Sequence, residues 1–292
     1  MNTVHEKPPW LMVKATPGPN YQRLKGIMRA KTLHTVCEEA HCPNIFECWD
    51  RDKTATFMIL GDTCTRNCRF CAVKSGRPGK HVDWDEPDRV ADAVRDMQLA
   101  HVVITSVDRD DLQDGGASIF AATVMAIRRQ APGCQVELLI PDFAGDEKAL
   151  QIVVDQQPEL LDHNVETVRR MTPKVRSRAT YDRSLTVLRN AKMMLPGQRT
   201  KSSIMLGVGE TWDEILETLD DLRASGVDIV TIGQYLRPTP QQMQVVRFYT
   251  PDEFAALQQE GMSRGFLHVE SGPLVRTSYH AARQALRAAI KP

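Results

Sequence analysis

The sequence predicts an α/β fold, a partial (β/α)6 barrel of the TIM type, and three observations carry this prediction. Six short apolar runs rich in β-branched residues recur along the chain. Amphipathic helical patterns lie between these runs. Strands that alternate with helices are typical of a parallel sheet, and six such units are fewer than the closed eight-fold barrel requires. The chain has 292 residues, which is enough to bury a large core.

The expected strands cover residues 56–60, 101–106, 136–140, 160–164, 203–206 and 228–233. Helical periodicity is clear at 88–98 and at 210–225, where apolar side chains recur on one face. Thr211 or Asp213 is available to cap the start of the second helix, and Gly226 is available to end it.

Three parts are predicted along the chain. Residues 1–55 form an N-terminal extension that carries the first group of cysteines, and residues 56–264 form the barrel. Residues 265–292 contain one more apolar run and a final helical segment, and we expect them to pack against the barrel as a C-terminal appendage.

Net charge and the distribution of apolar residues indicate the compartment of the protein. Lysine plus arginine equals aspartate plus glutamate, at 37 each, so net charge gives no support to binding of nucleic acid or a membrane surface. No apolar run approaches the roughly 18 residues of a membrane span, and residues 1–30 lack the apolar core of a secretory signal. We therefore expect a cytoplasmic protein.

Six of the seven cysteines lie between Cys37 and Cys71. In a reducing compartment, thiols clustered at short spacing are typical of metal ligands rather than of disulfides. The remaining thiol, Cys134, stands before a predicted strand and is expected to be a small buried residue.

Cys64, Cys68 and Cys71 form a C-x3-C-x2-C group directly after the first predicted strand. Active-site loops gather at that carboxyl end of a parallel sheet. Three thiolates can hold three corners of a [4Fe–4S] cluster and leave one iron open to a substrate with adjacent amine and carboxylate groups. The alternative is a structural zinc site, although zinc ribbons favour two well-separated C-x2-C pairs. This spacing, with Phe70 before the last cysteine, resembles the radical S-adenosylmethionine (SAM) superfamily, in which the cluster cleaves SAM to a 5′-deoxyadenosyl radical.

Cys37, Cys42 and Cys48 form a C-x4-C-x5-C group, which suits a second cluster that is again one ligand short. His34 and His41 are close enough in sequence to supply that ligand. Each is more simply explained as a surface or capping histidine.

The two cysteine groups together resemble the lipoyl synthase family. The resemblance covers about residues 20 to 283 and includes segments 33–40, 54–62, 105–112, 163–167 and 269–281. It implies that Ser278 supplies an oxygen ligand to the second, auxiliary cluster, and it makes Arg276 a candidate for guiding the substrate arm or for electrostatics near that cluster. Two departures stand out: Thr277 replaces the first serine of the usual Arg-Ser-Ser-Tyr motif, and residues 242–245 replace a frequent His-Leu-Pro-Val.

Candidates for SAM contact lie after the predicted strands. By resemblance, Gly115 and Gly116 approach the methionyl amine, although most Gly-Gly pairs are simply turns. Polar residues at or beyond strand ends are candidates for binding ribose, carboxylate or adenine, with loop or capping roles as the simpler explanation. They are Asn164, Glu166, Arg178 and Gln234.

The resemblance implies a sulfurtransferase that inserts sulfur at C6 and C8 of an octanoyl chain carried on a lysine. It would consume two SAM molecules and sulfur from the auxiliary [4Fe–4S] cluster. The implied partners are a carrier, either a dehydrogenase E2 lipoyl domain or the glycine cleavage H protein, and a ferredoxin or flavodoxin reductant. Two alternatives remain open: a methylthiotransferase acting on RNA or protein, which usually has extra domains, and a zinc-organised binding module.

Overall fold

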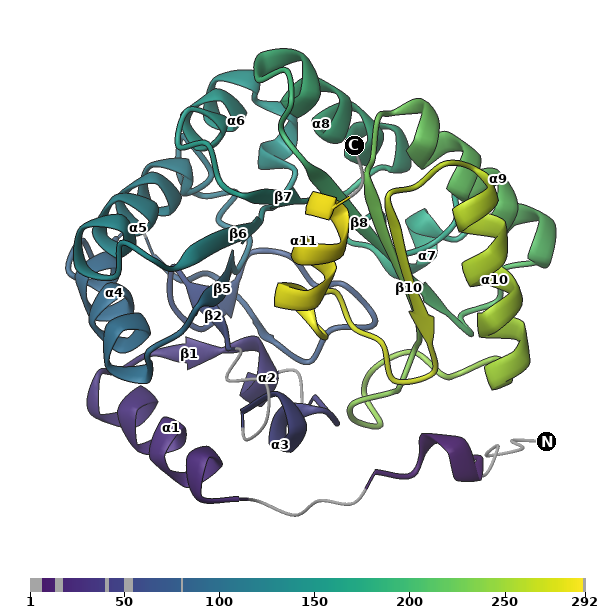
Figure 1. The fold of residues 1–292 in the computed structure, drawn as a ribbon, viewed down its shortest axis with the longest axis horizontal. Coiled ribbons are helices and arrows are strands. Elements are labelled where there is room, and N and C mark those ends of the chain that lie inside the picture. The colour runs from purple at the N-terminus through teal and green to yellow at the C-terminus, as the bar shows by residue number, and fades with distance from the viewer. Residues whose placement is uncertain (1–6, 14–17, 40–41, 50–54, 80, 291–292) are drawn as a thin grey trace.

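A computed structural model describes residues 7–13, 18–39, 42–49, 55–79 and 81–290. One curved sheet of eight strands dominates it (Figure 1). In spatial order the strands are β1 (His34–Thr35), β2 (Thr56–Ile59), β5 (His101–Ser106), β6 (Gln135–Leu139), β7 (Leu160–Asp162), β8 (Thr200–Leu206), β9 (Ile229–Gln234) and β10 (His268–Gly272). From β2 to β10 all neighbours pair in parallel, whereas β1 pairs antiparallel with β2.

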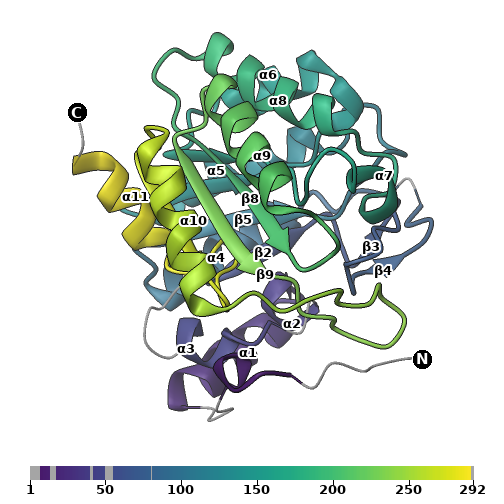
Figure 2. The same cartoon turned by 90° about the vertical axis from the view of Figure 1, so that its right-hand side faces the viewer.

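Six helices cover the outer face of the sheet, each following one strand (Figures 1 and 2). They are α4 (Glu86–Met97), α5 (Ala117–Gln130), α6 (Glu147–Val154), α8 (Tyr181–Met194), α9 (Trp212–Ala224) and α10 (Pro251–Ser263). The predicted (β/α)6 barrel is therefore confirmed. It stays open between its edge strands β1 and β10.

Shorter elements complete the fold. They are η1 (Pro9–Leu11), α1 (Pro19–Ala30), α2 (Val36–Glu39), α3 (Ile45–Glu47), η3 (Phe143–Gly145), α7 (Thr172–Val175), α11 (Ala281–Ile290) and the parallel pair β3 (Thr63–Cys64) and β4 (Lys74–Ser75). Among the described residues, no helix is both long enough and apolar enough to cross a membrane.

Element boundaries follow local signals closely. β5 has the predicted bounds, and α9 begins with a capping box in which Thr211 and Glu214 satisfy each other's backbone N–H groups. Of the two predicted caps, Thr211 is therefore the one used. Gly226 follows the helix at φ +83°, a left-handed conformation that suits a helix end.

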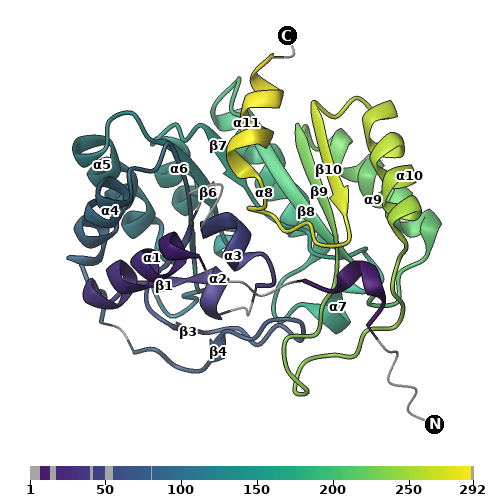
Figure 3. The same ribbon diagram turned by 60° about the horizontal axis from the view of Figure 1, so that its bottom comes forward.

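The C-terminal segment 265–290 contacts the barrel, and part of it belongs to the sheet itself. β10 joins the sheet in parallel register with β9, so the barrel has a seventh parallel strand. The next helix, α11, packs against β10 and β5 within the curve of the sheet (Figures 1 and 3). Between them, the segment 273–280 crosses the open side of the barrel, where α2 and α3 lie.

The inner face of the sheet carries charge. On β5, Val102 and Ile104 belong to the core between sheet and helices, whereas His101 lies buried on the other face. Glu137 of β6 and Lys201 of β8 are also fully buried there. The barrel interior is thus polar near the beginnings of its strands.

Candidate active site

The second cysteine group lies at the carboxyl end of β2, as predicted. Cys64 ends β3, and Cys68 and Cys71 follow in the loop that leads to β4. Burial, together with smaller effects that include the neighbouring Cys68 thiol, raises the pKa of Cys64 to about 11 and the pKa of Cys71 to about 12. The three thiols are therefore close enough to influence one another, and without a metal they would be protonated at neutral pH.

Backbone N–H groups point at two of these sulfur atoms. The Arg66 N–H donates to Cys64 Sγ at 3.4 Å, and the Ser177 N–H donates to Cys68 Sγ at 3.4 Å. Such donors stabilise thiolate charge and tune the potential of iron–sulfur clusters. The donor set of this loop therefore fits a [4Fe–4S] cluster.

Arg66 anchors the loop to the barrel rim, a role that the sequence analysis missed. Its buried guanidinium binds Asp110 at 2.8 Å and Asp142 at 2.6 Å, and it lies 3.3 Å from Asp108. Although burial acts to lower it, the hydrogen bond to Asp110 raises the pKa of Arg66. Asp108 and Asp110 stand in the segment 105–112 that carried the family resemblance, but nothing in the sequence paired them with Arg66.

Gly115 and Gly116 follow β5 and open α5. Their φ angles are +59° and +93°, and a Cβ on Gly116 would lie 2.2 Å from Leu60 Cδ1. Only glycine fits there without displacing a neighbour. Gly115 also lines a cavity of about 420 Å³, together with Arg66 and others. Gly115 thus lies beside Arg66 of the cluster loop, whereas Gly116 is buried; their contact with SAM stays a prediction.

Asn164 and Glu166 lie beyond β7, near the thiols. Asn164 Nδ2 donates to Glu166 Oε1 at 3.0 Å and to Thr277 Oγ1 at 3.0 Å. Asn164 Oδ1 is buried without a hydrogen-bond partner in the described structure. Burial raises the pKa of Glu166, and burial, with a smaller contribution from the charge of Glu166, raises the pKa of Cys68. Glu166 also has φ +66°, a left-handed conformation that is uncommon for non-glycine residues.

The two other predicted SAM contacts differ from each other. The Arg178 side chain is 66% exposed, and its Nη1 lies 3.6 Å from Asp110 Oδ2. By contrast, Gln234 is buried, its Nε2 donates to the Leu206 carbonyl at 2.9 Å, and its Oε1 accepts from the Tyr249 N–H at 2.9 Å. The Gln234 amide holds backbone in place, so this residue is not among those that we propose for SAM binding.

The first cysteine group lies beside β1 and β2. Cys37 is buried in α2, and burial, with a further contribution from Cys42, raises its pKa to about 12. The Trp49 indole N–H lies beside the Cys37 thiol and has no hydrogen-bond partner in the described structure. A buried donor aimed at a sulfur ligand fits a cluster at this place.

The C-terminal segment covers this group. Asn44 Nδ2 donates to the Leu274 carbonyl at 2.7 Å, and the Tyr279 hydroxyl donates to Glu47 Oε2 at 3.2 Å. Ser278 is therefore held against the segment that carries Cys42 and Cys48. This arrangement fits a fourth, oxygen ligand.

Arg276 stands next to Cys42 without a carboxylate partner among the described residues. Burial lowers the pKa of Arg276, and the negative charge of a Cys42 thiolate opposes this effect. A half-buried cation without an acidic partner needs a nearby negative charge, which thiolate-bound iron would provide. Of the two histidines considered as ligands, His34 is engaged by Glu39 at 3.4 Å, and His41 lies outside the described residues.

Within the described ranges, no three His, Cys, Asp or Glu side chains converge on one point as they would around a single metal ion. A four-iron cube binds each thiolate at a different iron, so its ligands are spread over the cube.

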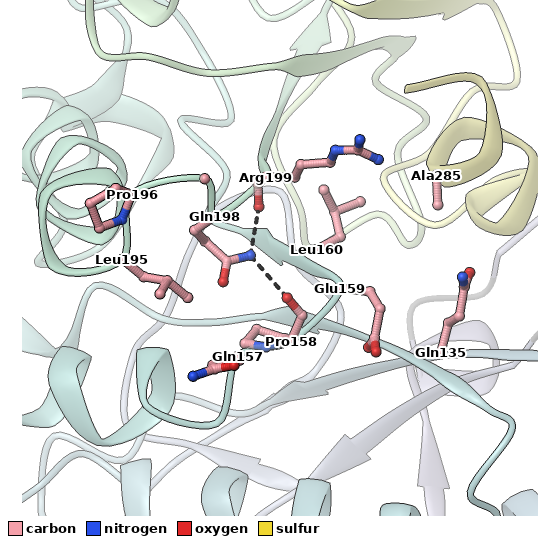
Figure 4. A pocket seen from close by; sticks show the side chains of 11 residues that line it. Gln135, Gln157, Pro158, Glu159, Leu160, Leu195, Pro196, Gln198, Arg199 and Ala285 are labelled. Atoms are coloured by element: carbon pink, nitrogen blue, oxygen red, sulfur yellow. Dashed lines mark hydrogen bonds between the residues drawn. The ribbon is translucent and has the colours of Figure 1, made fainter. Parts of the chain in front are cut away.

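A second cavity, of about 370 Å³, lies at the opposite end of the barrel, where β6, β7 and β8 begin (Figure 4). The Gln198 amide crosses it and donates to the carbonyls of Pro158 at 3.0 Å and Arg199 at 2.9 Å. None of the predicted site residues, all of which the structure describes, lines this cavity. The candidate site is therefore the carboxyl end of the barrel.

Comparisons with known proteins agree with this geometry. The model of the radical SAM superfamily matches residues 58–222, and the model of the N-terminal domain of lipoyl synthase matches residues 2–42. Lipoyl synthase from Shouchella clausii is 59% identical over 97% of this chain and 92% of its own. Lipoyl synthase from Symbiobacterium thermophilum is 60% identical over 99% of this chain and 89% of its own.

Solved structures with low sequence identity share the fold. Methylornithine synthase aligns with a TM-score of 0.55 at 13% identity, over 84% of this chain and 72% of its own. Streptococcus suis SuiB bound to S-adenosylmethionine aligns with a TM-score of 0.54 at 11% identity, over 71% of this chain and 45% of its own. The fold, the cysteine groups and a sequence identity of about 60% over nearly the full length together show that this chain belongs to the lipoyl synthase family of the radical SAM superfamily.

Proposed function

We propose that this chain inserts two sulfur atoms, at C6 and C8, into an octanoyl chain attached by an amide to a lysine of a carrier protein. Two C–H bonds are replaced by two C–S bonds, at the expense of two SAM molecules and of sulfide from the auxiliary cluster. The observation that carries this proposal is the placement of two separate cysteine trios on one barrel, with the Ser278 segment against the second trio. The identity of about 60% to lipoyl synthases supports it.

We assign Cys64, Cys68 and Cys71 to the cluster that binds SAM. When bound there and reduced, a [4Fe–4S] cluster supplies the electron that cleaves SAM to methionine and a 5′-deoxyadenosyl radical. A radical is needed because the hydrogens on C6 and C8 have no neighbouring group that makes them acidic. The N–H donors of Arg66 and Ser177 would hold and stabilise the thiolates of Cys64 and Cys68.

For SAM itself we propose contacts with Gly115, Gly116, Asn164, Glu166 and Arg178. Gly115 lines the cavity beside Arg66, Gly116 adds a backbone turn that only glycine fits, and Asn164 offers a buried oxygen without a partner in the described structure. Glu166 and Arg178 add charges of opposite sign on the same rim, which suits a ligand that carries both an amine and a carboxylate.

We assign Cys37, Cys42, Cys48 and Ser278 to the auxiliary cluster. Serine oxygen is a harder ligand than thiolate and a poorer match to iron–sulfur chemistry, so its bond is the one most easily released while the cluster gives up sulfide. Arg276, beside Cys42, balances the negative charge of this group.

The substrate is bound to protein, and we propose a dehydrogenase E2 lipoyl domain or the glycine cleavage H protein as its carrier. We propose a ferredoxin or flavodoxin as the reductant. A cytoplasmic location is supported by the seven cysteines, all of which are free of disulfides.

The decisive experiment is anaerobic turnover of an octanoylated lipoyl domain with SAM and dithionite, followed by mass spectrometry of the carrier. Two added sulfur atoms per carrier are expected. Methionine and 5′-deoxyadenosine formed without any sulfur on the carrier would contradict the proposal.

Cysteine variants separate the roles of the two clusters. Cys64→Ala should abolish SAM cleavage, whereas Cys37→Ala should retain some cleavage but insert no sulfur. Cys134→Ala is the matched control, because Cys134 is a buried thiol that belongs to neither cysteine group. This variant should behave as wild type in both assays. Equal loss of cleavage in the Cys64 and Cys37 variants would contradict the assignment.

A further inference from the structure

The outer side of the cluster loop forms one continuous surface with two other loops. The Arg69 N–H donates to the Val175 carbonyl at 2.9 Å, and the Arg69 carbonyl accepts from the Met243 N–H at 2.9 Å. Gln242 Nε2 donates to the Cys71 carbonyl at 3.0 Å. Figure 2 shows the same arrangement, with β3 and β4 between α7 and the loop that follows β9. These contacts fix three loops around the ligands of the SAM-binding cluster.

The three loops share a bias in charge. Segments 63–82, 171–181 and 229–251 contain no aspartate or glutamate, and each contains lysine or arginine. The chain as a whole has equal numbers of acidic and basic residues, at 37 each. The bias is therefore local to the surface around the cluster loop.

Of the exposed cations in these segments, four lie nearest to the contacts with the cluster loop, and we name them the cationic rim: Arg69, Lys174, Arg178 and Arg237. Each lies within a few residues of a contact with the cluster loop. Lys174 precedes the acceptor Val175, and Arg178 follows Ser177, the N–H donor to Cys68 Sγ.

The charge of the cationic rim is poorly neutralised. In the described part of the chain, Arg69 and Lys174 form no ion pair, and Arg237 donates to carbonyls of its own loop. Only Arg178 has an acidic neighbour, Asp110, at 3.6 Å.

Several exposed arginines on other surfaces are neutralised by carboxylates. Arg170 pairs with Glu214 at 2.6 Å, and Arg95 pairs with Asp92 at 2.9 Å. Unpaired cations grouped on one face produce a positive field, which attracts an acidic partner and speeds its association.

We infer that the cationic rim docks an acidic one-electron donor protein. This inference rests on the proposed function, which requires electrons to reach the cluster held by Cys64, Cys68 and Cys71. At each encounter the donor is oxidised by one electron and the cluster is reduced by one. Since the rate of electron transfer falls steeply with distance, the donor must dock where the cluster lies closest to the surface. Arg69, exposed between two cluster ligands, marks that place.

The first test measures binding directly. The cluster-loaded enzyme and oxidised flavodoxin are brought together anaerobically, and Kd is measured by biolayer interferometry at several salt concentrations. Lys174→Glu should raise Kd several-fold at low ionic strength, and Arg69→Glu/Lys174→Glu should raise it about tenfold or more, with both effects fading as salt screens the charges. Arg189→Glu, an exposed arginine on α8 without an ion pair in the described structure, is the matched control and should leave Kd unchanged.

The second test measures reduction of the cluster by stopped-flow absorbance. Reduced flavodoxin should reduce the Lys174→Glu variant several-fold more slowly than wild type at low ionic strength, while dithionite, a small reductant, should reduce both at the same rate. Lys174 lies outside the cluster loop, so its variant remains informative even if Arg69→Glu impairs cluster assembly.

Two results would overturn the inference. One is a Lys174→Glu variant that binds and accepts electrons from flavodoxin as wild type does. The other is a variant with unchanged flavodoxin kinetics but weaker binding of the octanoylated carrier, which would assign the cationic rim to the carrier. Failure of the proposed function is distinguishable from both, because it would appear as absent sulfur insertion in the wild type driven by dithionite.

Discussion

Replacing Lys201 with methionine should destabilise the protein by about 3–5 kcal/mol, the usual loss when one partner of a buried ion pair is removed. The Lys201 ammonium contacts the Glu137 carboxylate and lies 3.1 Å from Asp162 Oδ2. All three side chains have no exposed area. Methionine has a similar volume, so the loss would reflect charge rather than an empty cavity.

The protonation states set the sign of the pH dependence. Although burial acts to raise it, the Lys201 ammonium lowers the pKa of Glu137 to about 2. Burial and the charge of Glu137 raise the pKa of Asp162 well above its usual range. The Lys201 charge thus favours the ionised form of Glu137, whereas burial and the Glu137 charge favour the protonated form of Asp162. The His101 ring also belongs to this network, with Nε2 at 3.0 Å from Glu137 Oε2.

Without Lys201, burial should raise the folded-state pKa of Glu137 above its unfolded value of about 4.3. A group with a raised folded pKa stabilises the fold only while it is protonated, and this contribution is lost as pH rises through that pKa. The deficit of Lys201→Met relative to wild type should therefore be larger at pH 8 than at pH 5.5. In wild type the lowered pKa of Glu137 makes its contribution constant across this window, since it is lost only as pH falls towards 2.

Guanidinium denaturation of the cluster-loaded protein, followed anaerobically by tryptophan fluorescence, measures the change. Lys192→Met is the control, because this lysine is partly exposed where it pairs with Asp228, and it should lose no more than about 1 kcal/mol. The double variant Glu137→Gln/Lys201→Met should regain part of the loss. A deficit for Lys201→Met that stays below about 1 kcal/mol and is the same at both pH values would refute the reasoning.

Three further substitutions test other parts of the structure. Thr211→Ala removes the capping box of α9 and should lower the free energy of unfolding by about 1 kcal/mol in the same denaturation assay. Gly116→Ala places a methyl group 2.2 Å from a Leu60 carbon at a positive φ, so SAM binding measured by equilibrium dialysis should weaken and the melting temperature should fall. Arg66→Gln removes one cationic partner of the buried Asp142 carboxylate, whose pKa Arg66 holds at about 2 against the effect of burial, and among the described residues it leaves Arg183 as the ion-pair partner. Stability of that variant should fall by about 3 kcal/mol, and iron content after reconstitution should fall with it.

Most of the fold could be predicted because its signals are local. Alternation of apolar runs and amphipathic helices is visible in short windows, and parallel strands joined by helices leave few possible topologies. The start of β8 could not be predicted from local patterns. Its first residues, Thr200 to Ser202, are polar and were left out of the predicted strand, yet they are fully buried in the sheet. Lys201 is buried because Glu137 and Asp162 neutralise it, and no local pattern reveals partners on other strands.

Some residues of the candidate site could likewise be predicted from local sequence, and others could not. The cysteine spacings alone suffice to propose both cluster groups, because ligands on a short loop can be recognised without knowledge of the tertiary structure. Gln234 illustrates the opposite case. An amide at the end of a strand has donors and an acceptor that suit a ligand or a neighbouring loop equally well. Only the structure shows that Leu206 and Tyr249 backbone groups use them.

Asn164 links the two cysteine groups of the candidate site through hydrogen bonds that the sequence does not reveal. Its amide N–H group is shared between Glu166, beside the thiols of the SAM-binding cluster, and Thr277, which precedes Ser278. Thr277 is also where this chain departs from the serine that is usual in the family, and the threonine hydroxyl makes the contact equally well. The substitution therefore preserves a hydrogen bond between residues 113 positions apart in the chain. A change at Thr277 that removes the hydroxyl would leave the Asn164 amide with Glu166 alone. This hydrogen bond therefore adds a link between the Ser278 segment and a residue that we propose for SAM binding.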